Sequence, residues 1–345
     1  MADLERKSAP GFPTCDDKRL WEVWLSYYHF PTLTVADDLG LFQLLDRRPL
    51  RIEAISSALG LSPRAAEALV GVVTALGFLS QHDGQFHLSE VSRNFLLPSS
   101  PFYWGGMLQF ARSVPVGHED LKKAIRNDRP REGTMEEMWE VHEMEPDRAR
   151  AFTSAMHTRS VHLGMAVARR VAEFANVKRL LDVAGGSGVF SIAIAQEHPQ
   201  IRCTVLELPR VATLAHAYIA QAGVGDRVDT CVANMWKDPW PAGYDALFFS
   251  NIYHDWDRAR CLHLTRKGFE ALPRGGRLFI HEVLLADAKD APLVGVSDSM
   301  LMMFFTEGKQ RTAGEFASIL TEAGFREPDV IPTHGYYSVL EAIKP

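Results

Sequence analysis

The sequence predicts an α/β protein in which a mostly α-helical domain precedes a Rossmann-like domain with a parallel sheet. Two observations predict this architecture. Up to about residue 177, apolar residues recur every three or four positions, as they do in amphipathic helices. From Lys178 onward, short apolar runs alternate with helical segments, which is typical of parallel strands buried on both faces. The length of 345 residues fits two domains of about 100–200 residues each.

The composition is that of a globular protein. Apolar residues make up 46% of the chain and charged residues 23%, which excludes a disordered or fibrous protein. The formal net charge of −6 argues against a nucleic-acid partner held by a basic surface. The four cysteines show no zinc-type spacing, so we expect no metal. The polar N-terminal segment and the shortness of the longest apolar run, residues 68–79, predict a cytoplasmic protein without a membrane span.

The first 100 residues have the outline of a winged helix. Helical spacing is found in three stretches, 21–45, 52–59 and 65–79. Ser62 offers an N-cap with Pro63 at the first helical position, and two short strands joined by Asp83-Gly84 follow the last helix. Between residues 34 and 97 there are seven acidic and five basic residues, whereas phosphate contacts need a basic face. We therefore expect a dimerisation or packing module rather than a DNA-binding one.

Residues 101–177 form a second helical stretch, rich in aromatic residues, methionines and histidines. Such stripes are usually core, but this one directly precedes a candidate cofactor domain, so we expect part of it to line a substrate pocket. The remaining residues, 178–345, alternate between strands and helices. The expected strands are 179–183, 202–206, 228–232, 244–250 and 277–283, and the expected helices are 189–197, 209–222, 257–272 and 313–323.

A glycine-rich turn follows the first strand of this domain. The turn, residues 184–188, leads from Asp182 directly into a helix, so that the backbone can approach a cofactor closely. The third glycine of a dinucleotide fingerprint would fall at Ser191, and no Lys-Ser or Lys-Thr pair of a P-loop follows. Glu207, at the tip of the second strand, can accept hydrogen bonds from both hydroxyls of a ribose. A ribose without a phosphate cradle indicates S-adenosylmethionine, and purely structural glycines in a tight turn are the alternative.

Three further segments place polar side chains at the carboxyl ends of strands, where such sheets bind their ligands. His254 follows the fourth strand in NIYHDWD, Glu282 follows from the fifth strand, and GKQRT opens the last helix. Together with LDVAGGSG, LELP, ANMW and a closing AGF, these segments resemble the small-molecule O-methyltransferase family, over nearly the whole chain. The family comprises the caffeate- and acetylserotonin-type enzymes and their bacterial natural-product relatives.

The resemblance implies S-adenosylmethionine-dependent methyl transfer to a small aromatic acceptor, without a metal, by a homodimer formed through the first domain. The cofactor-binding residues that it implies are Ser160, Asp182, Ala184, Gly185, Gly186, Glu207, Leu208, Asn234, Met235 and Ser250. The implied catalytic residues are His254 as the base, Glu282, which holds the base in place, and Gln310. The implied acceptor-binding residues are Trp139, Phe152, Met156, Leu301, Met302 and Phe305.

The sequence departs from the family pattern at three of these positions. Asn234 replaces an aspartate, so that adenine would meet an amide oxygen. Ser250 replaces a lysine that plant relatives often carry, and Gln310 replaces a glutamate that would stabilise an imidazolium by its charge. Because C-methylation of a phenol ring needs the same base, O- and C-methylation both stay open. The competing interpretations are a catalytically silent homologue, a nicotinamide oxidoreductase and a winged-helix transcription factor.

Overall fold

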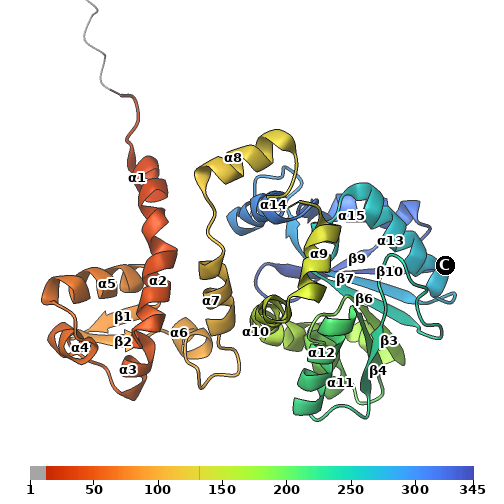
Figure 1. The fold of residues 1–345 in the computed structure, drawn as a ribbon, viewed down its shortest axis with the longest axis horizontal. Helices are drawn as coiled ribbons and strands as arrows, with labels where there is room; N and C mark the ends of the chain where they lie inside the picture. The colour runs from red at the N-terminus through yellow and green to blue at the C-terminus, as the bar shows by residue number, and fades with distance from the viewer. Residues whose placement is uncertain (1–12, 132) are drawn as a thin grey trace, which may run out of the picture. The chain divides into compact units, whose positions relative to one another are not determined.

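The structure is a computed structural model that describes residues 13–131 and 133–345, apart from the side chains of Met135 and His142. The first twelve residues of the polar N-terminal segment, for which we expect no signal peptide, lie outside the described residues. The chain forms two compact units, Met1–Ser100 and Pro101–Pro345 (Figure 1). The helical stretch 101–177 is part of the second unit.

The first unit consists of short helices and one β-hairpin. Its elements are α1 (Lys18–Leu25), the helical turn η1 (Ser26–Tyr28), α2 (His29–Asp38), α3 (Leu41–Arg47), α4 (Ile52–Leu59), α5 (Pro63–Ala75), β1 (Leu79–His82), β2 (Gln85–Leu88) and α6 (Glu90–Phe95). The helical stretch expected over 21–45 is divided, because Gly40 takes a left-handed φ of 75° before α3. The helix expected to reach Leu79 ends at Ala75, and Gly77, with a φ of 83°, turns the chain into β1.

Local signals in the sequence set the start of α5 and the turn of the hairpin. Ser62 Oγ accepts a hydrogen bond from the amide of Ala65 at 3.3 Å, and Pro63 lies in the first turn, as predicted. Asp83 and Gly84 have positive φ values of 51° and 73° and join β1 to β2 in the two-residue turn that suits an antiparallel hairpin. The hairpin expected from the Asp-Gly pair is therefore confirmed.

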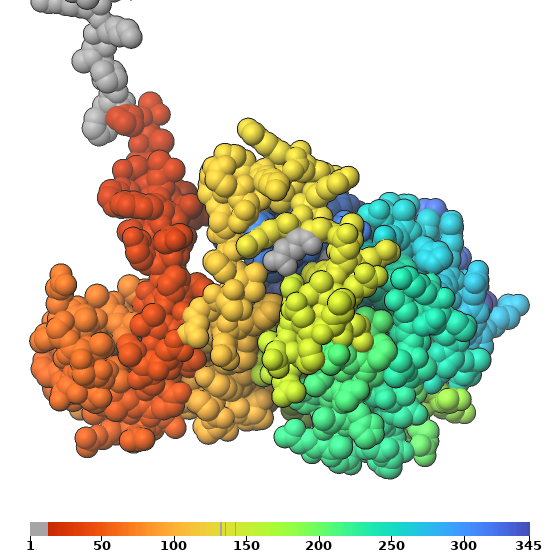
Figure 2. Space-filling view, in the orientation of Figure 1, coloured from red at the N-terminus to blue at the C-terminus, as the bar shows by residue number. Residues whose placement is uncertain are grey.

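The outer face of α1 and of the start of α2 is apolar. No residue of α1 is buried, and the exposed large apolar side chains of this segment are Leu20, Trp21, Val23, Trp24, Leu25, Tyr27, Tyr28 and Phe30. Figure 2 shows α1 in red on the outside of the first unit. Many large exposed apolar side chains on one segment are typical of a surface that binds another protein.

The second unit begins with helices α7 (Gly105–Ser113), α8 (His118–Asn127), α9 (Met135–Met144) and α10 (Pro146–Arg170). The long helix α10 packs against α11 (Val189–Glu197), the helix that follows the glycine-rich turn. At Gly164 a Cβ atom would lie 3.1 Å from the carbonyl oxygen of Val189. The small residue therefore lets α10 lie directly over the start of α11.

The sheet of the second unit has the strand order β5-β4-β3-β6-β7-β10-β9. Its strands are β3 (Arg179–Val183), β4 (Arg202–Glu207), β5 (Val228–Val232), β6 (Ala246–Ser250), β7 (Arg277–Leu285), β9 (Asp329–Pro332) and β10 (Tyr337–Ile343). The five strands from β5 to β7 are parallel, and β10 and β9 continue the sheet antiparallel. A two-residue strand, β8 (Arg311–Thr312), pairs with the end of β7.

Helices cover both faces of this sheet (Figure 1). One core joins α10, α11 and α12 (Pro209–Gln221) to alternate strand residues such as Leu180 and Phe248. The other core joins α13 (Arg258–Ala271) and α15 (Ala313–Glu322) to the intervening residues, such as Leu181 and Leu247. Because successive strand residues point to opposite faces, both sides of each central strand are buried, as the continuous apolar runs predict.

Strands β8, β9 and β10 and the helix α14 (Leu293–Phe305) were not expected from the sequence. Strand β9 has four residues, ends in Pro332 and lies at the edge of the sheet, where a proline costs no ladder hydrogen bond. Such a segment shows no period that distinguishes it from a loop. The strand expected over 244–250 begins at Ala246.

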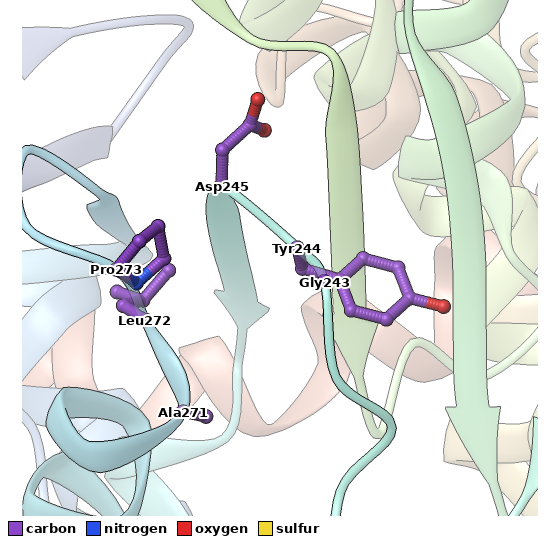
Figure 3. A pocket seen from close by; sticks show the side chains of 6 residues that line it. All are labelled: Gly243, Tyr244, Asp245, Ala271, Leu272 and Pro273. Carbon is purple, nitrogen blue, oxygen red and sulfur yellow. The ribbon is translucent and has the colours of Figure 1, made fainter.

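Within the described ranges, no helix is long and apolar enough to cross a membrane. A surface hollow lies beside the amino end of β6 and is lined by Gly243, Tyr244, Asp245, Ala271, Leu272 and Pro273 (Figure 3). The strand runs away from this hollow, so its carboxyl end, which leads to His254, belongs to the opposite edge of the sheet.

Candidate active site

The candidate site lies at the carboxyl edge of the parallel strands. The strand order reverses at β3, since β4 lies on one side of it and β6 on the other. Doubly wound sheets bind their ligands outside the carboxyl ends of the strands at such a switch point. The predicted residues at this edge are Asp182 and Glu207 in β3 and β4, Asn234 after β5, Ser250 in β6, and Glu282 in β7.

Left-handed residues shape the turn that follows β3. Ala184, Gly186 and Gly188 have φ values of 54°, 59° and 73°. A Cβ atom on Gly185 would lie 2.6 Å from an oxygen of the Asp182 carboxyl group, so the backbone could not approach that group with any other residue there. A Cβ atom on Gly186 would meet no atom within 4 Å. The turn is therefore packed against Asp182 and open on its outer side.

Asp182 is buried beneath this turn. Ser191 Oγ donates a hydrogen bond to Asp182 Oδ2 at 2.7 Å. Burial raises the pKa of Asp182 to about 7, and the hydrogen bonds from Ser191 oppose this rise. The residue that breaks the dinucleotide fingerprint thus holds the acid below the glycine-rich turn.

Glu207 connects the end of β4 to the glycine-rich turn. Its Oε1 accepts a hydrogen bond from the amide of Gly186 at 3.0 Å, and its Oε2 accepts one from the amide of Leu208 at 2.8 Å. Burial raises the pKa of Glu207 to about 7, although both hydrogen bonds favour the ionised form. A carboxylate has about four acceptor positions, so each oxygen of Glu207 can accept one further hydrogen bond.

Asn234 and Met235 follow β5 at the same edge. Asn234 Oδ1 accepts hydrogen bonds from the backbone amides of Trp236 at 2.9 Å and Lys237 at 3.1 Å. The amide oxygen that we expected to meet adenine therefore caps the following turn. Contact between Asn234 and adenine stays a prediction, in which the Nδ2 group would face the base because the oxygen is engaged.

Ser250 takes part in a hydrogen-bond network inside the second unit. Its Oγ lies 2.9 Å from His281 Nδ1 and accepts a hydrogen bond from Asn251 Nδ2 at 3.1 Å. Tyr337 Oη donates to Asn251 Oδ1 at 3.0 Å. Burial lowers the pKa of His281 to about 3, so this imidazole is neutral. A contact of Ser250 with a cofactor stays a prediction.

His254 lies in the helical turn η3 (Tyr253–Asp255) directly after β6, and Glu282 faces it from β7. Glu282 Oε1 accepts the backbone amides of Ile252 at 3.1 Å, Tyr253 at 3.0 Å and His254 at 3.4 Å. Its Oε2 lies 3.1 Å from His254 Nδ1. One carboxylate thus holds both the backbone and the ring of the histidine.

Gln310 contacts the same ring nitrogen from the loop before β8. Its Nε2 lies 2.9 Å from His254 Nδ1 and donates a hydrogen bond to Asp298 Oδ2 at 2.6 Å. Asp298 comes from α14 and did not feature in the sequence analysis. The sequence did not indicate it, because its contact with Gln310 depends on where α14 lies. The three predicted catalytic residues are therefore brought together, with one further carboxylate behind Gln310.

Two opposing effects set the pKa of His254. Burial lowers it, but the negative charges of Glu282 and Asp255 and the hydrogen bond to Glu282 outweigh burial and raise the pKa to about 9. Asp255 Oδ1 lies 3.6 Å from His254 Nε2. Burial also raises the pKa of Asp255 to about 6. A histidine with these neighbours is a stronger base than free imidazole.

Two residues that sequence reasoning missed hold the turn that carries His254. The guanidinium group of Arg311 is buried and donates to the carbonyl oxygens of Tyr253 and Trp256, both at 2.6 Å. A Cβ atom on Gly308 would overlap the backbone of His254 and Trp256, so the loop can pass there only with a glycine. Both residues belong to the GKQRT motif, which was quoted for the resemblance without roles for them.

Helix α10 borders the glycine-rich turn. Ser160 is buried on this helix, one turn before Gly164. His157 Nδ1 lies 2.8 Å from Ser187 Oγ, which ties the helix to the turn. The His157 ring also stacks on Tyr218 at 3.9 Å, and burial lowers its pKa to about 4. The stretch expected as a linker thus contributes directly to this edge.

The residues expected to bind the acceptor lie on three helices. Trp139 of α9 and Phe152 of α10 meet edge to face at 5.8 Å. Met156 follows Phe152 by one turn of α10 and is partly buried. On α14, Met302 is buried and Phe305 partly buried. Leu301, on the same helix, is 39% exposed, which is more than we expect of a pocket-lining residue.

The residues at this edge fit a nucleoside cofactor that has no phosphate. The outer side of the turn at Gly186 is open, and the Glu207 carboxylate beside it has acceptor positions left for two hydroxyl groups. The fold and this edge therefore define a class, namely Rossmann-like proteins that bind a nucleoside-containing cofactor at the switch point.

Comparison with known protein families identifies the family within this class to which the chain belongs. Residues 118–326 match the O-methyltransferase domain, and residues 21–98 match the O-methyltransferase dimerisation domain. The chain belongs to the family of S-adenosylmethionine-dependent O-methyltransferases, and the resemblance noted in the sequence is confirmed.

Individual relatives agree with this family. The chain is 35% identical to a 3-hydroxy-5-methyl-1-naphthoate 3-O-methyltransferase of Streptomyces sahachiroi, over 86% of each chain. It is 31% identical to an L-tyrosine C(3)-methyltransferase of Streptomyces lavendulae, over 86% of this chain and 83% of the relative. The structure of human N-acetylserotonin methyltransferase with S-adenosylmethionine matches with a TM-score of 0.80 at 23% identity, over 97% of this chain and 99% of that one, which shows the same fold.

Proposed function

We propose that the protein methylates a phenolic hydroxyl of a small aromatic or polycyclic metabolite, with His254 as the general base. The observation that carries this proposal is the position of His254 at the carboxyl edge, with Nδ1 between Glu282 and Gln310. For this role the proton on Nδ1 points to the Glu282 carboxylate, which leaves the Nε2 lone pair to accept a proton from the acceptor, and the Gln310 Nε2 group, itself a donor, bonds to Asp298 and not to Nδ1.

The pKa of His254 suits this proton transfer. Bound S-adenosylmethionine supplies an electrophilic methyl group on a positively charged sulfur. A phenol has a pKa of about 10, by analogy with tyrosine, and His254 has one of about 9. Proton transfer from the phenol to Nε2 is therefore nearly balanced in free energy, and the phenolic oxygen gains charge as it attacks. General-base help of this kind accelerates reactions by about 10²–10⁴-fold.

In the same proposal, the remaining predicted residues hold the two substrates. Glu207 accepts the ribose hydroxyls, Asn234 and Met235 border adenine, and the glycine-rich turn with Ser160 meets the amino-acid end of the cofactor. The aromatic pair of Trp139 and Phe152 packs against the flat acceptor.

A second candidate function is methylation of a ring carbon next to a phenolic hydroxyl. The L-tyrosine C(3)-methyltransferase among the relatives favours it, because its name describes methyl transfer to carbon. Carbon attack from a phenolate needs the same proton removal by His254. The two reactions differ only in which acceptor atom faces the methyl group.

We also propose that two chains form a homodimer through the first unit. The match to a dimerisation domain and the exposed apolar face of α1 and α2 support this assembly. An apolar face of this kind is covered when a second copy supplies the same face.

The proposed function is tested with labelled S-adenosylmethionine and a panel of phenols. His254→Ala should lower turnover by about 10²–10⁴-fold while the dissociation constant of the cofactor, measured by calorimetry, stays the same. His216→Ala, on the exposed side of α12, is the matched control. Equal losses of turnover and cofactor binding would show that His254 is structural. NMR of the product distinguishes a methoxy group from an aryl methyl group.

A further inference from the structure

Arg159 is a cation for which the proposed function has no task. It lies on α10, three residues after Met156 and seven after Phe152, so the three side chains share one face of the helix. The Nε atom of Arg159 is buried, and nothing in the described part of the chain accepts a hydrogen bond from it. Buried donors in proteins are normally paired, so this donor points to an acceptor that the chain itself does not supply.

The groups whose pKa is lowered by the charge of Arg159 belong to several elements around the candidate base. Burial dominates the pKa shifts of Asp255 in η3, His281 in β7 and Tyr337 in β10, and the Arg159 charge lowers the pKa of each. The same holds for His162, where burial comes first and the charges of His334 and Arg159 follow. These charge effects indicate that the guanidinium group lies near the carboxyl ends of β6 and β7.

The acids on the cofactor side of the edge have other main influences. Burial and the hydrogen bonds from Ser191 are the main influences on the pKa of Asp182. For Glu207 they are burial, the hydrogen bonds from Leu208 and Gly186, and the charges of Asp182 and Glu143.

A second buried donor lies in the same region. Trp104 Nε1, at the start of α7, is buried and has no acceptor among the described residues. The ring of Trp104 lies 6.5 Å from that of His162, which is one helical turn from Arg159 on α10. Two unmatched N–H donors beside a positive charge favour an anionic oxygen ligand.

We propose that Arg159 binds a carboxylate on the methyl acceptor, so that the acceptors are hydroxy-substituted aromatic carboxylic acids. This inference rests on the proposed function and names its substrate class. A guanidinium group matches the planar carboxylate with two parallel N–H donors, which fixes the orientation of the acid as well as holding it. The ring between carboxylate and hydroxyl then presents the hydroxyl to His254. The cofactor also has a carboxylate, and the experiment separates these two sources.

The test compares an acid with the same ring lacking the carboxylate, namely 3-hydroxy-1-naphthoate and 2-naphthol. Dissociation constants are measured by calorimetry on the enzyme saturated with S-adenosylhomocysteine, and kcat/KM with labelled cofactor. The unaltered chain should prefer the acid by about 10- to 100-fold, the range of a charge-assisted hydrogen bond. Arg159→Met should abolish this preference. Arg170→Met removes an exposed positive charge from the same helix and should keep it.

Arg159→Lys keeps the charge but lacks the planar fork, so it should retain part of the preference and guards against a folding defect in Arg159→Met. The inference is overturned if the unaltered chain shows no preference for the acid, or if Arg159→Met keeps it. It is also overturned if Arg159→Met weakens cofactor binding and leaves the acid preference intact, because the arginine would then serve the cofactor carboxylate. Failure of the proposed function is a separate result: neither naphthol nor acid would receive label, whatever their binding constants.

Discussion

Replacing Glu282 with glutamine isolates the effect of its charge on the candidate base. The amide keeps an oxygen for the backbone N–H groups of residues 252–254 and removes only the negative charge 3.1 Å from His254 Nδ1. Burial, which lowers the pKa of His254, then has less to oppose it, and we expect the pKa to fall from about 9 toward the ordinary value of 6.5. A change of this size corresponds to about 3 kcal/mol.

The assay is the pH dependence of kcat/KM. In the unaltered enzyme the neutral form of His254 increases with pH, so kcat/KM should rise up to about pH 9 and then level off. In Glu282→Gln the rise should end near pH 6.5, and the plateau should be about tenfold lower or more, because a weaker base removes the phenolic proton less well. The control is Glu322→Gln, which removes a half-exposed carboxylate from α15. If kcat/KM of Glu282→Gln still rises up to about pH 9, the pKa of about 9 does not belong to His254 paired with Glu282, and the assignment is refuted.

Three further predictions concern other parts of the edge. Ala184→Gly should raise the free energy of unfolding, measured with urea, by about 1 kcal/mol, because alanine is strained at a φ of 54°; no change would mean that the turn relaxes. Gly308→Ala should lower turnover by about 100-fold at unchanged cofactor affinity, since the new Cβ displaces the backbone at His254; near-normal turnover would show that the loop adapts. Cofactor affinity should weaken as the pH falls below 7, where Glu207 becomes protonated, and Glu207→Gln should remove this dependence.

The parallel part of the fold follows from the sequence because its signals are local. Strand β3, helix α11 and strand β5 begin and end at the expected residues, since short apolar runs and the glycine-rich turn delimit them. The antiparallel strands β9 and β10 carry no such signal. Their place in the sheet depends on pairing between β10 and β7, which are far apart in the sequence.

The residues of the candidate site also differ in this way: local signals predict some of them, and others depend on the packing of distant segments. His254 and Glu282 could be predicted, because residues at the ends of adjacent parallel strands meet at one edge. Asp298 could not, because its side chain reaches Gln310 only when α14 is placed over that edge. The orientation of Asn234 could not be predicted either. Its oxygen accepts hydrogen bonds from two backbone amides of the following turn, and the residue types do not show the conformation of that turn.

The turn that carries His254 is held by Glu282 and Arg311, and both residues are synthesised after it. Tyr253 is held by Glu282, 29 residues later, and by Arg311, 58 residues later. Contacts across such separations form late, because the intervening chain must first be closed into a loop. During synthesis the turn leaves the ribosome long before its two supports. Alignment of the imidazole is thus delayed until the C-terminal segment has docked, and a chain that ends before residue 311 would carry the histidine without its geometry.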